Sequence, residues 1–203
     1  MTFIAARVAG QPVSIEEVDT REARLRNSPA AASLPLAGTS EGRQLRRWIT
    51  QLIVTERVVA AEAARMGITA DTAPPVADVL PDGAARLEVG SVTAAVLADP
   101  LARALFRYVT ADVRVDDTEV ARYHAGNPMR FAGHSRSPQG WRVAGRCPSL
   151  DQVRGVITDH LLAAARRREF RNWLDARRSA LVVLSPGYEH PGDPRQPDNV
   201  HRH

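Results

Sequence analysis

The chain has 203 residues, 44% hydrophobic and 25% charged, a composition typical of a soluble globular domain rather than of a disordered chain. All 27 basic residues are arginine, and with 23 acidic residues they leave a net charge of only +4, so no nucleic-acid partner is expected. The single cysteine, Cys147, excludes an internal disulfide framework and favours a reducing compartment. Since the sequence has no signal peptide and no membrane-spanning apolar run, we expect a cytoplasmic protein without a membrane partner.

The N-terminal residues predict two short strands followed by a helix. Residues 3–8 and 12–13 are rich in strand-forming side chains and flank a Gly-Gln pair that favours a turn. Ser14 and Glu17 have the spacing of a capping box, which predicts a helix from this point to about Asn27.

The strongest periodic signal lies between Ser40 and Gly67. Its apolar residues recur at helical spacing and predict one long amphipathic helix: Leu45, Trp48, Ile49, Leu52, Ile53, Val59, Ala60, Ala63 and Met66. Ser40 is expected to cap its start and Gly67 to end it in a left-handed conformation. The charged residues, Arg47 and Glu62 among them, fall on the opposite face and are expected in solvent.

The segments on either side of this helix contain many prolines. Residues 28–39 and 70–83 are therefore expected to be loops without helix. A further helix is predicted from Ser91 to Val109, with Pro100 kinking or restarting it. Residues 113–115 resemble a short strand.

Two more capping boxes mark the last helices. Asp116 and Glu119 open a helix that ends near Asn127-Pro128, and Ser149 with Gln152 opens a long helix to about Arg178. A loop is expected at 132–148 and a strand at 180–184. A strand at each end indicates that the termini pair, so the fold class is mainly α with a small β-sheet, in one domain over residues 1–184 with an extended tail at 185–203.

Four segments in this order resemble SurA-type and PrsA-type parvulin chaperones. They are RVAGQPVSIEEVDTR, LRRWITQLIVTERVVAAEAARMGI, VDDTEVARYHAGNPMRF and SLDQVRGVITDHLLAAARRREFRNWLDARRSALVVL. Between the third and fourth segments those proteins carry a parvulin isomerase domain, whereas this chain has only residues 132–148. A segment below about 40 residues rarely folds alone, so prolyl isomerase activity is expected to be absent.

What the resemblance implies is a SurA N-terminal-like helical module with an apolar groove for an extended peptide or a partner's helix. The groove is expected to be lined by apolar residues of the predicted helices: Trp48, Leu52, Phe106 and Trp173. The first functional hypothesis is thus a cytoplasmic, non-catalytic chaperone-type module that holds a partner protein or peptide. A homodimer remains an open alternative.

Two further segments contain potential nucleophiles. Gly133-His134-Ser135-Arg136-Ser137 is similar to the Gly-His-Ser-x-Gly nucleophile elbow of acyltransferases, but serine replaces the last glycine and a surface loop is the favoured interpretation. Cys147 has no placed partner and is expected to be unreactive.

The tail is the better candidate for a site. It places five potential ligands of Zn or Fe on an extended chain: His190, Asp193, Asp198, His201 and His203. A disordered polar tail is the competing interpretation, because the spacing matches no diagnostic metal motif. The second functional hypothesis is therefore a metal- or histidine-dependent enzyme on the same scaffold. In it the tail histidines supply a metal or an acid-base pair beside His124 or His134, and the substrate is a small molecule or a carrier-bound acyl chain.

Overall fold

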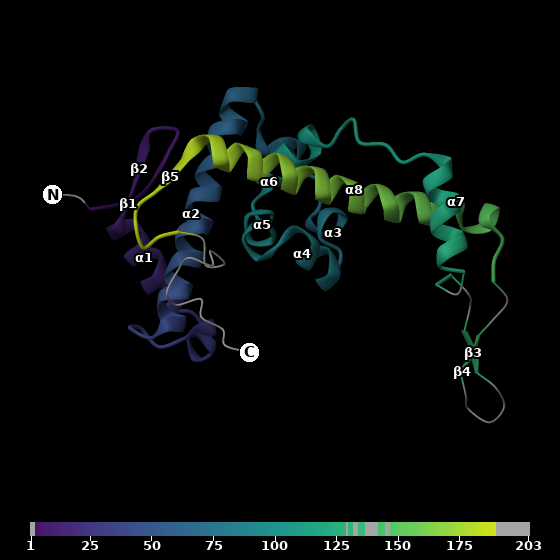
Figure 1. Cartoon of the computed structure of the whole chain (residues 1–203), viewed down its shortest axis with the longest axis horizontal. Coiled ribbons are helices and arrows are strands. Elements are labelled where there is room, and N and C mark those ends of the chain that lie inside the picture. Colours follow the sequence, from purple (N-terminus) through teal and green to yellow (C-terminus); the bar gives the residue numbers. More distant parts are fainter. Residues whose placement is uncertain (1–2, 129, 132–133, 137–141, 145–146, 190–203) are drawn as a thin grey trace.

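A computed structural model of the chain describes residues 3–128, 130–131, 134–136, 142–144 and 147–189. The fold is mainly helical with a small antiparallel sheet made by the N- and C-terminal strands, which confirms the predicted fold class (Figure 1). None of the helices in these ranges is both long and apolar enough to cross a lipid bilayer.

The sheet has the order β2-β1-β5, with strands β1 (Ile4–Val8), β2 (Gln11–Ser14) and β5 (Val182–Leu184). β1 pairs antiparallel with both neighbours, and Ala6 lies opposite Leu184. Ala9 and Gly10 join β1 to β2 with positive φ angles of 48° and 80°, as a tight hairpin turn requires. The predicted pairing of the two ends of the domain is therefore confirmed.

Helix α1 (Ile15–Arg26) begins where predicted, since the Ser14 side chain accepts a hydrogen bond from the Glu17 amide. The central helix, α2 (Ser40–Met66), also matches its predicted bounds, and Gly67 ends it in the left-handed conformation at φ 66°. Its cap is one residue earlier than predicted, because the side chain of Thr39, not Ser40, accepts a hydrogen bond from the Gly42 amide.

The middle of α2 is surrounded on all sides. Every residue from Ile49 to Thr55 is buried, because α1, β1, α5, α6 and α8 all contact this helix. The expected solvent face was wrong at two positions, Arg47 and Glu62, which are 5% and 2% exposed. Both lie under elements that come from the far end of the chain.

Ion pairs and hydrogen bonds hold that end of the chain on α2. Glu62 pairs with Arg177 at 2.7 Å and with Arg65 at 2.8 Å. The Arg47 Nε donates to the Gly187 carbonyl at 3.2 Å, and the Gln51 Nε2 donates to the Tyr188 carbonyl at 3.3 Å.

The aromatic ring of Tyr188 extends this packing. The Cζ atom of the Arg46 guanidinium group lies 5.9 Å from the centroid of this ring, and Tyr188 packs against the hydrophobic core. The extended tail predicted from residue 185 therefore packs on the domain as far as Tyr188. Residues 190–203 lie outside the described ranges.

Prolines did not prevent helix formation in the connections, so the prediction of plain loops was wrong. Residues 28–39 include a 3-10 helix, η1 (Pro29–Ser33), and the second connection includes η2 (Ala70–Thr72) and the short α3 (Val76–Val79). The prolines sit before or at the first turn of these elements, where the missing N–H costs no hydrogen bond.

A further helix, α4 (Gly83–Val89), was not predicted; Asp82 caps it. The predicted helix over 91–109 is two helices, α5 (Ser91–Val96) and α6 (Pro100–Val109), which confirms the restart at Pro100. Residues 113–115 form no strand.

The last part of the chain forms an arm. Helix α7 (Asp117–Gly126) and the N-terminal half of α8 (Leu150–Leu181) pair with each other, and α8 then runs across α4 and α6 to the sheet (Figure 1). Both predicted capping boxes are present. Where a plain loop was expected over 132–148, the described residues form a two-stranded hairpin of β3 (His134–Arg136) and β4 (Arg142–Ala144).

Candidate functional site

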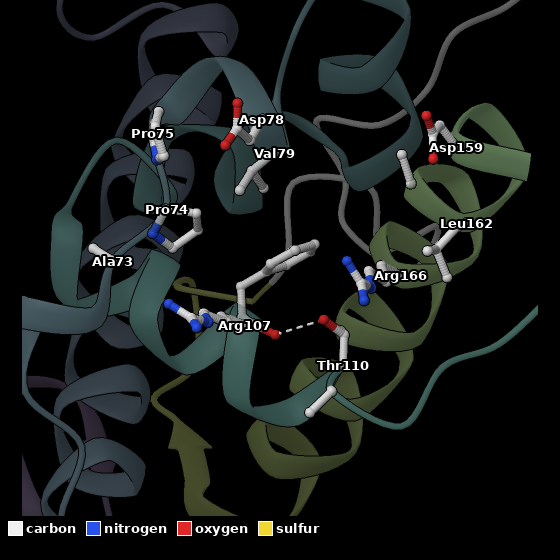
Figure 2. A pocket seen from close by; sticks show the side chains of 13 residues that line it. Ala73, Pro74, Pro75, Asp78, Val79, Arg107, Thr110, Asp159, Leu162 and Arg166 are labelled. Carbon is white, nitrogen blue, oxygen red and sulfur yellow. Dashed lines mark hydrogen bonds between the residues drawn. The ribbon is translucent and has the colours of Figure 1, made fainter. Parts of the chain in front are cut away.

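A groove of about 700 Å³ lies between α6, the segment 73–79 and the middle of α8 (Figure 2). Its walls combine apolar and charged side chains: Ala73, Pro74, Pro75, Asp78, Val79, Phe106, Arg107, Thr110, Ala111, Asp159, Leu162, Ala163 and Arg166. The volume falls in the range of ligand-binding clefts, which makes the groove the candidate site.

Arginines of α6 hold the proline-rich wall in place. The Arg103 Nε donates to the Pro74 carbonyl at 2.8 Å, and its Nη1 donates to the carbonyls that end α5. One turn further along, the Arg107 Nη1 donates to the Thr72 carbonyl at 3.3 Å. These two bonds tie the start of the proline-rich wall to α6.

The apolar base of the groove belongs to the core. Phe106 is 6% exposed, and its ring packs edge-to-face on the buried Phe170 at 5.3 Å. Across from α6, the α8 residues that line the groove include Ala163, whose side chain is a single methyl group. The small residue leaves the space that a larger side chain would fill.

Three charged groups of the groove are left for a ligand. Within the described ranges, Asp78 and Asp159 form no hydrogen bond or ion pair through their carboxylates. The Nε of Arg166 is buried and lacks a hydrogen-bond partner among the described residues. Figure 2 shows Arg166 reaching from α8 into the groove, with Asp159 on the same helix. The site therefore combines two carboxylates and the guanidinium group of Arg166 with apolar walls.

Only one of the four predicted groove residues, Phe106, lines this groove. Trp48 is half-buried elsewhere, where its Nε1 donates to the Ser91 Oγ at 3.2 Å, and Leu52 is in the core. Trp173 stacks on Phe170 at 5.8 Å. The structure does not bring these four side chains together into one cavity. Sequence reasoning missed the proline-rich wall, whose only signal was the Pro74-Pro75 pair.

The predicted metal ligands His190, Asp193, Asp198, His201 and His203 all lie outside the described residues. In the part of the chain that the structure describes, no three His, Cys, Asp or Glu side chains gather as a metal site. The metal hypothesis therefore stays a prediction.

The other proposed catalytic groups have structural surroundings of a different kind. The His124 Nε2 lies 3.1 Å from the Pro148 carbonyl, a hydrogen bond that ties the end of α7 to the start of α8. Ser135 is in the middle of β3, opposite Val143, whereas a nucleophile elbow places its serine at a strand-to-helix turn. The backbone at this segment does not have the geometry of an elbow.

Comparison with known proteins gives one partial match. A family of unknown function (DUF7158) matches residues 4–41, the segment that contains β1, β2, α1 and η1. No curated protein matches the chain with significance. No solved structure matches it with significance either.

Proposed function

We propose that the protein is a SurA-like, chaperone-type binding module without prolyl isomerase activity, which holds an extended segment of a partner protein in the groove between α6 and α8. The cytoplasm is its proposed location, because a single cysteine suits a reducing compartment. The enzyme alternative rests on tail residues outside the described ranges, and no observation on the described residues favours it.

The groove is the observation that carries this proposal. Apolar walls of proline, valine, phenylalanine and leucine suit the side chains of an extended peptide, and about 700 Å³ accommodates several of them. The guanidinium group of Arg166 lines the groove and suits a backbone carbonyl of such a peptide, because an extended segment has carbonyls without partners.

The order of elements supports the likeness to parvulin chaperones. A strand pair, two helices, a helical connection and a long return helix lead back to a strand beside the first one. At the position of the isomerase domain, β3 and β4 pair at the far end of the arm (Figure 1). A hairpin of this size has no room for an isomerase active site.

The charges of the groove indicate which peptides fit best. Asp78 and Asp159 have no cation partner within the described residues, so basic side chains on either side of an apolar one would complement them. We therefore expect preference for segments that mix apolar and basic residues.

Binding of a fluorescein-labelled peptide of alternating leucine, phenylalanine and arginine tests the proposal by fluorescence anisotropy. Ala163→Trp should fill the groove and weaken binding at least tenfold, whereas Ala176→Trp, at an exposed position of the same helix, should change it less than twofold. Equal affinities of both variants would remove the groove from the proposal. A peptide in which glutamate replaces each arginine should bind at least threefold more weakly.

Prolyl isomerase activity is a separate question. A chromogenic tetrapeptide containing one proline should isomerise at the uncatalysed rate in the presence of the protein. Acceleration that saturates with substrate, whether or not Ala163→Trp abolishes it, would contradict the proposal of a non-catalytic module.

A further inference from the structure

A second pocket, of about 270 Å³, lies on the other side of α8. Its α8 residues are Leu161, Ala164, Ala165 and Arg168, whereas the groove uses Asp159, Leu162, Ala163 and Arg166. Because successive residues of an α-helix are rotated by about 100°, these two sets point in opposite directions. The second pocket is thus a different site from the groove, closed on its outer side by α7 and the connection that precedes it.

Positive charge dominates this second pocket. Arg114, Arg122 and Arg168 come from three different segments of the chain and line the same space. Within the described ranges, Arg122 and Arg168 form no hydrogen bond or ion pair, and Arg114 donates only to the backbone carbonyls of Ala111 and Val113. Three like charges in one pocket repel each other, and a bound anion would offset this repulsion.

The carboxylates nearby are already engaged. Glu119 also lines the pocket, but its Oε2 accepts a hydrogen bond from the Asp116 amide at 3.2 Å in the capping box of α7. On the neighbouring surface, Glu88 pairs with Arg167 at 2.6 Å. With one carboxylate lining the pocket, the three arginines leave an excess of two positive charges.

The remaining walls are apolar and aromatic. Leu161 and two alanines line the α8 side, and Tyr123 lines the α7 side. The Tyr123 Oη is buried and has no hydrogen-bond partner among the described residues.

A histidine of α8, His160, lies beside Tyr123. The rings of His160 and Tyr123 lie 5.4 Å apart. Burial lowers the pKa of His160 most, and the nearby Arg130 and Arg167 lower it further. Neither Arg130 nor Arg167 lines the second pocket, so they add to the positive charge around it.

We propose that this second pocket binds a small amphiphilic anion, a carboxylate or phosphate group joined to an apolar or aromatic body. The anionic group would lie among the guanidinium groups of Arg114, Arg122 and Arg168, which present planar donors matched to such oxygens. The body would pack on Leu161 and the ring of Tyr123. The anionic group suits the groove on the opposite face less well, because the carboxylates of Asp78 and Asp159 line that groove without a partner among the described residues.

Three naphthalene probes separate the two parts of this proposal: 2-naphthoate, 2-naphthyl phosphate and the neutral 2-naphthylmethanol. Titration calorimetry and ligand-observed NMR should detect both anions and show the alcohol to be at least tenfold weaker. The ratio of the affinities of the two anions identifies carboxylate or phosphate as the preferred head group. Affinity for the anions should fall as salt is raised, since the guanidinium groups are exposed.

Matched variants place the probes in the pocket. The double variant Arg122→Gln with Arg168→Gln should bind both anions at least tenfold more weakly. The control Arg86→Gln, at an exposed position of α4 away from the pocket, should change the affinity for either anion less than twofold. Circular dichroism checks that each variant is folded. Equal loss in the Arg86→Gln control, equal affinity for the alcohol, or no binding at about 1 mM of either anion would overturn the proposal.

Discussion

The two halves of helix α8 differ in how they are held. In the C-terminal half, Arg167, Phe170 and Leu174 are buried against α2, α4 and α6. In the N-terminal half, Ile157 is the buried residue among those described, and α7 is the helix that covers it. One continuous helix is therefore part of the core at one end and half of a two-helix arm at the other.

The arm depends on local interactions that water weakens. Its contacts include the two capping boxes, the hydrogen bond between His124 and the Pro148 carbonyl, and the ion pair of Arg154 with Asp117, whose side chains are 41% and 89% exposed. Exposed pairs and caps each contribute about 1 kcal/mol or less. We therefore expect the arm to open at a lower free energy than the core. Both pockets lie at the boundary between the two halves.

The largest effect is expected in the embedded half. Phe170→Ala removes a fully buried ring that contacts Phe106 and Trp173, and should lower the free energy of unfolding by about 3 to 5 kcal/mol. Denaturant unfolding followed by far-UV circular dichroism measures this change. A loss below about 1 kcal/mol would mean that this half of α8 is not part of the core.

Glu62→Ala should follow, at about 3 kcal/mol. Removing one partner of a buried ion pair leaves its cations without compensation, although Arg65 and Arg177 retain access to water and keep the cost at the low end of the range.

In the arm, Asp117→Asn breaks the exposed pair with Arg154 and should cost about 0.5 kcal/mol or less. Similar losses for the two variants would contradict the difference between the halves.

The Glu62 pair also predicts a pH dependence. Burial by itself raises the pKa of Glu62, but hydrogen bonds from Arg65 and Arg177 outweigh burial and leave the pKa below its ordinary value. A lowered folded-state pKa stabilises the protein fully above the unfolded-state pKa, about 4.3, and the contribution is lost as the pH falls through the folded-state pKa. The stability difference between wild type and Glu62→Gln should therefore be constant near neutral pH and shrink in acid below about pH 4.3.

Ile157→Ala tests whether the arm unfolds separately from the core. Loss of this buried side chain should destabilise the arm by about 2 kcal/mol, so amide hydrogen exchange in α7 should accelerate roughly thirtyfold. Exchange in β1 and α2 should change little. If exchange accelerated equally in β1, the arm and the core would unfold as one unit.

Removal of the residues beyond Glu189 is expected to have little effect on stability. A chain ending at Glu189 keeps Tyr188 on the core and should retain its stability within about 0.5 kcal/mol. A chain ending at Gly187 loses that ring and should be less stable by about 1 to 2 kcal/mol. Thermal unfolding of the two proteins measures the contrast.

The same truncated proteins test the metal hypothesis for the tail. Untagged protein purified without chelator would be compared with the chain ending at Glu189 by elemental analysis. A metal site made by His190, His201 and His203 predicts stoichiometric Zn or Fe that the truncation abolishes. Less than about a tenth of an equivalent, with no rise in melting temperature on adding either metal, would contradict it.

Periodicity and capping predicted the helices that depend on local sequence. α1, α2, α7 and α8 begin and end within a few residues of their expected positions, because their caps and apolar stripes are encoded within the helix itself. The sheet was also predictable, since two strand-like segments at the ends of a helical domain have few other partners.

Features that depend on distant segments were not predictable. Arg47 and Glu62 fall on the polar face of α2, yet Gly187 and Arg177, more than a hundred residues later, cover them. The groove is likewise assembled from residues 73–79, α6 and α8, and none of these segments by itself has a signal for a cavity. Side-chain periodicity reports which face is apolar, but not which later segment will reach it.

The pairing of β1 with β5 has a consequence for synthesis of the protein. Ala6 lies opposite Leu184, and the Ser185 amide and hydroxyl donate to the carbonyls of Ala5 and Ile4, so the sheet is complete only after residue 185 has been translated. Until Phe170 and Leu174 emerge from the ribosome, the apolar side of α2 has no cover from α8. Such long-range closure slows folding, and the nascent chain must pass through an exposed, aggregation-prone stage before its last strand arrives.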